Sequence, residues 1–131
     1  MKEPEPHTSA SGEQIKSFRD LKVWRKGHIL ATKSIGICRE LPNNEETRMV
    51  KGQLIRSATS VPANIAEGYG SYSGKGFARY LRIARGSVTE TEYWFYLLYD
   101  LKYVKREEYE ELSENCRELI AMLSSFITKL G

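Results

Sequence analysis

The sequence contains few of the side chains that enzymes use for proton transfer and metal binding. Of its 131 residues, two are histidines (His7 and His28) and two are cysteines (Cys38 and Cys116). Histidine is the commonest general acid or base, and zinc sites are built from close sets of histidine and cysteine. The four residues are scattered, and the Glu-x-x-His motif of di-iron bundles is absent. We therefore expect no enzyme, no metal site and no cofactor, and we interpret the cysteines as reduced core thiols.

Long apolar segments are also absent. No apolar run approaches the roughly 20 residues that a membrane-spanning helix needs, and the N-terminus lacks the pattern of a secretory signal. This predicts a cytoplasmic protein with no membrane partner. The glycines at positions 68, 70, 74 and 76 lack the Lys-Ser/Thr ending of a phosphate-binding loop. They are predicted to connect two helices, with Gly68 and Gly70 ending the first of them.

What the sequence does contain is helical periodicity. Apolar residues recur at alternating spacings of three and four, which places them on one face of a helix. Four such segments are predicted, over about residues 18–41, 43–68, 75–101 and 106–130. In the first, a row from Leu21 through Trp24 and His28 to Cys38 is predicted to be buried, and a second row beginning at Gly27 widens it. His28 is accordingly interpreted as a packed or interface side chain.

These segments predict an all-α fold. Two of the three connections are short, so neighbouring helices must be antiparallel, which gives an up-down-up-down four-helix bundle. Residues 1–17 are rich in proline, serine, threonine and glycine and almost lack apolar residues, so they are predicted to be a disordered N-terminal tail. Residues 18–131 are predicted to form one domain. Ser17 is expected to cap the first helix, with Asp20 as its capping-box partner.

Several runs of residues together resemble a known family. They are SFRDLKVW at residues 17–24, QLIRSA at 53–58, SVPANIAEG at 60–68 and IARGS at 83–87. They resemble the four helix bundle protein family, also called the 23S rRNA intervening-sequence protein family, and the likeness covers nearly everything after the tail. Ser57 stands where the family usually has a second arginine. Thr91 stands in Glu90-Thr91-Glu92, where the family usually has Glu-Leu-Glu.

The resemblance implies several properties that periodicity does not. Members are expected to form ring-shaped homopentamers, and some are encoded inside intervening sequences of bacterial large-subunit rRNA genes. A related branch, the accessory variability determinants of diversity-generating retroelements, binds reverse transcriptase and nucleic acid. The partners implied for this chain are therefore further copies of itself, RNA, DNA or a hybrid, and a reverse transcriptase. For most members no activity is established.

The charge distribution gives separate support for a nucleic-acid partner. Residues 18–106 carry 16 Lys and Arg against 8 Asp and Glu, a balance of +8, whereas residues 107–131 carry 2 against 6, a balance of −4. Basic side chains attract phosphate groups and make binding depend on salt. The candidate phosphate contacts are Lys22, Lys26, Lys33, Arg79, Arg82 and Arg85. In the alternative interpretation, the charged faces pair between protomers and the protein is an interaction scaffold.

Other side chains leave two interpretations open. Asn64, Glu67, Ser87 and Glu90 lie at or near the interior positions of the second and third helices. We expect them to form hydrogen bonds between helices and to fix their register, with a ligand-binding carboxylate as the alternative. The tyrosines at positions 69, 72, 80, 93, 96 and 99 are candidates for stacking on bases, or for packing in the core or an interface.

Overall fold

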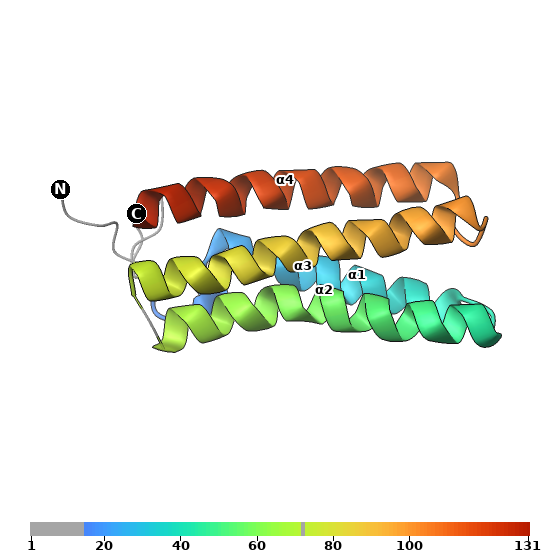
Figure 1. The fold of residues 1–131 in the computed structure, drawn as a ribbon, viewed down its shortest axis with the longest axis horizontal. Coiled ribbons are helices and arrows are strands. Elements are labelled where there is room, and N and C mark those ends of the chain that lie inside the picture. The colour runs from blue at the N-terminus through green and yellow to red at the C-terminus, as the bar shows by residue number, and fades with distance from the viewer. Residues whose placement is uncertain (1–14, 72) are drawn as a thin grey trace.

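The computed structural model describes residues 15–71 and 73–131. A short 3-10 turn, η1 (Phe18–Asp20), precedes four helices: α1 (Lys22–Glu40), α2 (Glu45–Ser71), α3 (Lys75–Asp100) and α4 (Arg106–Leu130). The helices lie side by side along one long axis, and each reverses the direction of the one before it (Figure 1). The predicted all-α four-helix bundle is therefore confirmed. Most of the predicted tail, residues 1–14, lies outside the described residues.

The predicted capping box at Ser17 is confirmed, but it caps η1 instead of α1. The Ser17 hydroxyl accepts from the backbone N–H of Arg19 at 3.2 Å, and the Asp20 carboxylate accepts from the backbone N–H groups of Lys16 and Ser17. These hydrogen bonds lower the pKa of Asp20. Leu21 is extended, so α1 begins at Lys22. Ile15, inside the segment predicted as tail, is only 3% exposed and belongs to the core.

The core lies between the helices. Leu54 and Ile65 of α2 have no exposed surface. On α3 the buried positions from Phe77 to Leu98 include a core row at alternating steps of four and three, and Phe77 and Phe95 of this row have no exposed surface. The prediction for α1 was partly wrong. The buried row runs through Gly27, Leu30 and Ser34, whereas Trp24 is only partly buried and His28 is exposed. At Gly27 a glycine is needed because α1 approaches α2 closely there.

Two glycines allow helices to come into direct contact. A Cβ atom at Gly27 of α1 would lie 2.9 Å from Val61 of α2, and one at Gly68 of α2 would lie 2.7 Å from the Cβ atom of Tyr80 of α3. The expectation that Gly68 ends the second helix was therefore wrong. Gly68 is buried inside α2, which continues to Ser71, and it serves as a packing position. The helix also runs without a break through Pro62.

The end of α3 is closed by backbone hydrogen bonds. Lys102 has a positive φ of 69°, its N–H donates to the carbonyl of Tyr99, and the N–H of Tyr103 donates to the carbonyl of Leu98 at 2.8 Å. This is the Schellman arrangement, with lysine in the place that glycine usually takes. The Tyr103 hydroxyl donates to Glu46 and accepts from Asn44 at 3.1 Å, which ties this turn to the start of α2. The hydrogen bond to Glu46 raises the pKa of Tyr103.

Candidate nucleic-acid interface

One face of α3 is exposed along the whole length of the helix. Its positions are separated by alternating steps of four and three, which places them in one line at 3.6 residues per turn. We call this line the outer seam, and all of its residues are exposed: Lys75, Arg79, Arg82, Gly86, Thr89, Tyr93, Tyr96 and Asp100. The core row of the same helix follows the same alternation about half a turn away. The outer seam therefore lies on the exposed side of α3, and its Tyr96 reaches the ring of Tyr109 of α4.

The chemistry of the outer seam changes along the helix. Its first three side chains, Lys75, Arg79 and Arg82, are basic, and we call them the basic half. Two small residues follow, and then the two tyrosines. Residues 75–89 of α3 contain no acidic side chain. Within the described residues, no side chain forms an ion pair with the basic half.

The candidate basic residues on α1 are placed differently. Lys26 forms an ion pair with Glu118 of α4 at 2.5 Å, and Lys33 lies 3.5 Å from Glu111 of the same helix. Lys22 is exposed and has no ion pair in the part of the chain that the structure describes. Arg85 of α3 is half-buried and donates to the Ser124 hydroxyl of α4 at 3.1 Å. Two of the six candidates are therefore already paired with carboxylates.

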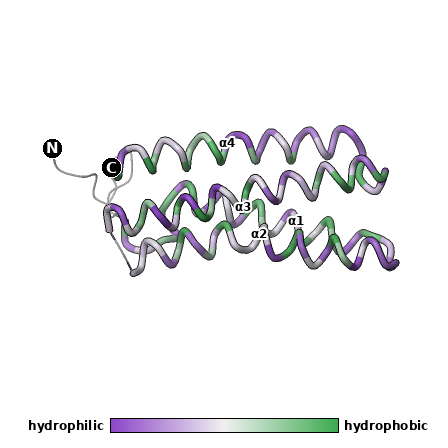
Figure 2. Tube along the Cα trace, viewed as in Figure 1, coloured by the Kyte–Doolittle hydropathy of each residue, from purple (hydrophilic) through white to green (hydrophobic). Residues whose placement is uncertain are grey.

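These pairs explain much of the charge difference between the helices. The first half of α4 is the most hydrophilic part of that helix (Figure 2), and its carboxylates face cations from two sides. Glu111 and Glu118 receive the α1 lysines, and Glu110 and Glu114 pair with Arg106 and Arg117 of α4 itself. The second half of α4, residues 119–130, contains no carboxylate. No acidic side chain of α4 therefore lies at the end of the bundle where α3 begins.

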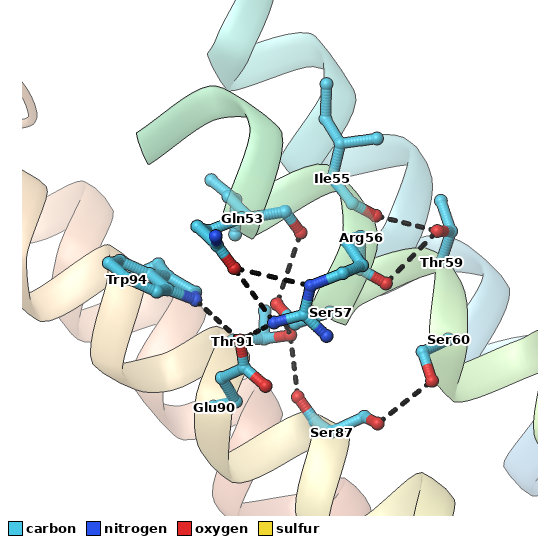
Figure 3. Close-up of polar contacts among 11 residues, drawn as sticks. Gln53, Ile55, Arg56, Ser57, Thr59, Ser60, Ser87, Glu90, Thr91 and Trp94 are labelled. Atoms are coloured by element: carbon cyan, nitrogen blue, oxygen red, sulfur yellow. Dashed lines mark hydrogen bonds and ion pairs between the residues drawn. The ribbon is translucent and has the colours of Figure 1, made fainter. Parts of the chain in front are cut away.

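Of the predicted polar motif, Ser87 and Glu90 make contacts between α2 and α3 (Figure 3), whereas Asn64 bonds to Ser60 within α2. The Ser60 hydroxyl accepts from Asn64 at 2.8 Å and from Ser87 at 3.0 Å. Glu90 pairs with Arg56 and accepts from the indole N–H of Trp94 at 3.0 Å. Glu67 is exposed and takes no part in these contacts.

Beside this motif lies a buried pair that sequence reasoning missed. The hydroxyls of Ser57 and Thr91 are 2.9 Å apart, and neither residue has exposed surface. The sequence signal for this pair was a polar residue at an interior position of each of two adjacent helices, 34 positions apart in the chain.

The tyrosines fall into two groups. Tyr93 and Tyr96 are 53% and 50% exposed. Each forms a T-shaped pair with a neighbouring aromatic ring: Tyr93 meets Trp94 with ring centroids 4.9 Å apart, and Tyr96 meets Tyr109 at 5.8 Å. Tyr99 is instead stacked on Tyr109 at 5.1 Å, and Tyr69 packs edge-on against Phe77. Tyr80 is half-buried, and Tyr72 lies outside the described residues.

The cysteine and histidine side chains that the structure describes do not come together in a reactive site. Cys38 and Cys116 are buried and unpaired, and burial raises the pKa of both thiols, to about 12 for Cys116. The exposed His28 ring stacks on Trp24 at 4.8 Å. Within the described residues, no group of three His, Cys, Asp or Glu side chains is arranged to hold a metal ion. The helices described here include none with the length and apolar character needed to cross a membrane.

A concave surface lies between α1 and α4, which pack together less closely than the other neighbouring helices. Two adjoining hollows follow this groove, with volumes of about 320 Å³ and 210 Å³, and Lys33 lines both. The larger one also contains Glu40, Tyr103 and Glu108. The ion pairs of Lys26 and Lys33 cross the groove, and Glu40 and Glu108 leave its lining with an excess of negative charge.

Comparison with known proteins places this arrangement in a family. The 23S rRNA-intervening sequence protein family matches residues 19–125. The chain belongs to that family. A solved structure from Bacteroides thetaiotaomicron, described as a protein of unknown function from the S23 ribosomal protein family, is 33% identical, with a TM-score of 0.74. The likeness covers 80% of this chain and 97% of that one. No curated protein matches the sequence.

The region that matches the 23S rRNA-intervening sequence protein family contains the outer seam and the polar contacts between α2 and α3. The resemblance expected from the sequence is thereby confirmed. The family and its solved member give the fold, and the description of that member gives its function as unknown. What the outer seam binds has to be argued from its own side chains.

Proposed function

We propose that this protein binds nucleic acid through the basic half of the outer seam and acts by binding, as an accessory factor, without catalysis. The observation that carries the proposal is that Lys75, Arg79 and Arg82 are exposed on one line of α3, with no ion pair among the described residues. Cations that are already paired with carboxylates gain less from a phosphate. The basic half is therefore a better candidate than the paired lysines of α1.

The position of the basic half within α3 adds to its attraction for phosphate. Lys75 is the first residue of the helix, and Arg79 and Arg82 lie in the next two turns. The N-terminal end of a helix carries a partial positive charge, which favours anions near the first turn. Arg85, although bonded to Ser124, contributes further positive potential from the adjacent turn. A phosphate backbone lying along the seam would meet several cations in sequence.

Assembly would multiply this effect. The resemblance stated above implies a homo-oligomer, with five copies expected, and each copy would contribute one basic half. Several weak contacts made at once give an avidity well above that of a single site. A reverse transcriptase is the protein partner that the same resemblance implies.

The test compares two double variants that remove the same charge from different places. Arg79→Gln/Arg82→Gln changes the basic half, and Lys26→Gln/Lys33→Gln changes the two paired lysines of α1. Binding to RNA, DNA and hybrid oligonucleotides is measured over a salt series, with the mass of the protein followed by light scattering. We expect the α3 variant to reduce the slope of log affinity against log salt by roughly 1.4 to 1.8, for two lost phosphate contacts. The α1 variant should keep the wild-type slope.

Equal losses in the two variants would show that net charge, not the seam, sets binding, and a wild type without salt-dependent binding would reject the proposal. The second candidate function is a protein-interaction scaffold. It is favoured by Ile29 of α1 and Met49 of α2, which are each 51% exposed although large and apolar. If the wild type does not bind nucleic acid and the α3 variant changes the mass of the oligomer, the protein is better described as a scaffold.

A further inference from the structure

The outer seam continues beyond its basic half to two exposed aromatic rings. Resting on the nucleic-acid binding proposed above, we infer that the seam recognises single-stranded nucleic acid in preference to a duplex, with Tyr93 and Tyr96 as the stacking surface for unpaired bases. The inference depends on three observations: the exposure of the two rings, their support by neighbouring aromatic side chains, and the unobstructed stretch of helix between them and the arginines.

The two rings are both available and held in place. About half of each tyrosine is exposed, although most aromatic residues of the bundle are partly or fully buried. Tyr93 pairs with Trp94 and Tyr96 pairs with Tyr109, and both contacts are T-shaped. A T-shaped contact covers at most one face of a ring, so each tyrosine keeps a face for another partner. The rings are three residues apart, so they stand about 4.5 Å apart along the helix axis, on the same side.

The stretch between the arginines and the tyrosines carries no obstacle. Gly86 and Thr89 are the seam residues between Arg82 and Tyr93, and both are exposed. A Cβ atom at Gly86 would have no atom within 4 Å, so nothing from α2 or α4 overhangs this point. Arg82 and Tyr93 are eleven residues apart, or about 16 Å along the axis. A strand whose phosphates lie on the basic half can therefore continue along the helix to the tyrosines.

A single strand matches this surface better than a duplex does. The faces of paired bases are covered by their neighbours in the stack, so rings standing on the side of a helix cannot reach them. Unpaired bases expose their faces, and stacking on aromatic side chains accepts any base. Phosphate contacts from the basic half are available to both forms. The tyrosines should therefore add affinity for single strands alone.

The experiment measures binding of a fluorescently labelled single-stranded oligouridine and of a duplex of equal length to the full chain at fixed salt. Tyr93→Ala/Tyr96→Ala removes both rings, and Tyr93→Phe/Tyr96→Phe keeps them. Met49→Ala/Ile55→Ala is the matched control, because it removes two exposed apolar side chains from α2. We expect the alanine pair to lose about fivefold or more in single-strand affinity for each ring. Duplex affinity and the salt slope should remain unchanged, and the phenylalanine and α2 variants should bind like the wild type.

The outcomes separate this inference from the function on which it rests. Equal affinity of the wild type for single strand and duplex, both dependent on Arg79 and Arg82, would overturn the inference and leave the proposed function standing. Absence of binding to either probe would overturn both. If the alanine pair changes the oligomer mass and not the single-strand affinity, the tyrosines form a contact between protein copies and the inference is wrong. Circular dichroism of each variant verifies that the exposed substitutions leave the bundle folded.

Discussion

At the scale of single residues, the clearest effect of folding is on the Cys116 thiol. The side chain has no exposed surface, and burial, helped by the charge of Glu92, raises its pKa from 9.0 to about 12. Between these values the unfolded chain releases a proton that the folded protein retains. Stability that is fully present below pH 9 is therefore lost as the pH rises towards 12.

This predicts a specific difference between two proteins. The free energy of unfolding of the wild type should fall more steeply above pH 9 than that of Cys116→Ala, by about 1.4 kcal/mol per pH unit. Urea unfolding at a series of alkaline pH values measures both slopes. Lysines and tyrosines titrate in the same range, but they are common to both proteins, so the difference isolates the thiol. Parallel curves would mean that Cys116 ionises in the folded state.

Single residues also mark the limit of what the sequence could predict about the site. Counting charges along the chain correctly indicates that residues 18–106 are basic, but it assigns equal standing to Lys26, Lys33, Arg79 and Arg82. The partners of the lysines, Glu118 and Glu111, lie 92 and 78 positions away. Only the antiparallel packing of α1 on α4 brings them together. The position of Tyr109 likewise decides that Tyr99 is packed by stacking, whereas Tyr96 meets the same ring in a T-shaped contact and stays half exposed.

At the scale of the helices, small residues decide how closely elements approach. The core row of α3 could be predicted from spacing because apolar residues occupy all of its positions except Thr91. In α1 two rows had the same spacing, and both were predicted to be buried. The interior holds Gly27 and Ser34 and leaves His28 exposed, and at Gly27 α2 lies too near for a larger side chain. Apolar spacing cannot show this, because it depends on the distance between two helices.

Two glycines of α2 allow a test of whether small residues set the distance between helices. We expect Gly68→Ala to destabilise the bundle by about 1–3 kcal/mol, because the added methyl group would overlap the backbone-proximal atoms of Tyr80 and touch the ring of Phe77. Gly52→Ala is the matched control in the same helix. Gly52 is exposed, a methyl group added there would have no atom within 4 Å, and the change should stabilise by roughly 0.5–1 kcal/mol. Urea midpoints measure both, and a loss at Gly52 equal to that at Gly68 would contradict the packing explanation.

At the scale of the whole molecule, charge is distributed unevenly along the bundle. The end at which α3 begins carries the basic half, whereas the first half of α4, with six carboxylates, lies at the opposite end (Figures 1 and 2). The net charge of +3 therefore describes the surface poorly. An anion approaching the molecule is attracted most strongly at the end that carries the basic half, which favours one orientation on a long polyanion.

Binding and folding of the whole molecule are linked. A ligand that binds only the folded protein stabilises it by about 2.7 kcal/mol when its concentration is 100 times its dissociation constant. We expect a single-stranded oligonucleotide at that excess to raise the urea midpoint of the wild type and of Lys26→Gln/Lys33→Gln. Arg79→Gln/Arg82→Gln at the same oligonucleotide concentration should show a clearly smaller shift. Equal shifts in all three proteins would place the binding surface elsewhere.

The interleaving of the two rows of α3 has a consequence for how this protein can change over evolutionary time. Core residues and outer-seam residues alternate along the same stretch of chain, yet each set faces a different environment. Substitutions in the outer seam leave the interior untouched, so natural variation there is not constrained by the need to fold. Related proteins can thus diverge in what they recognise while keeping the same bundle, and the eight positions of the outer seam are where such divergence should concentrate.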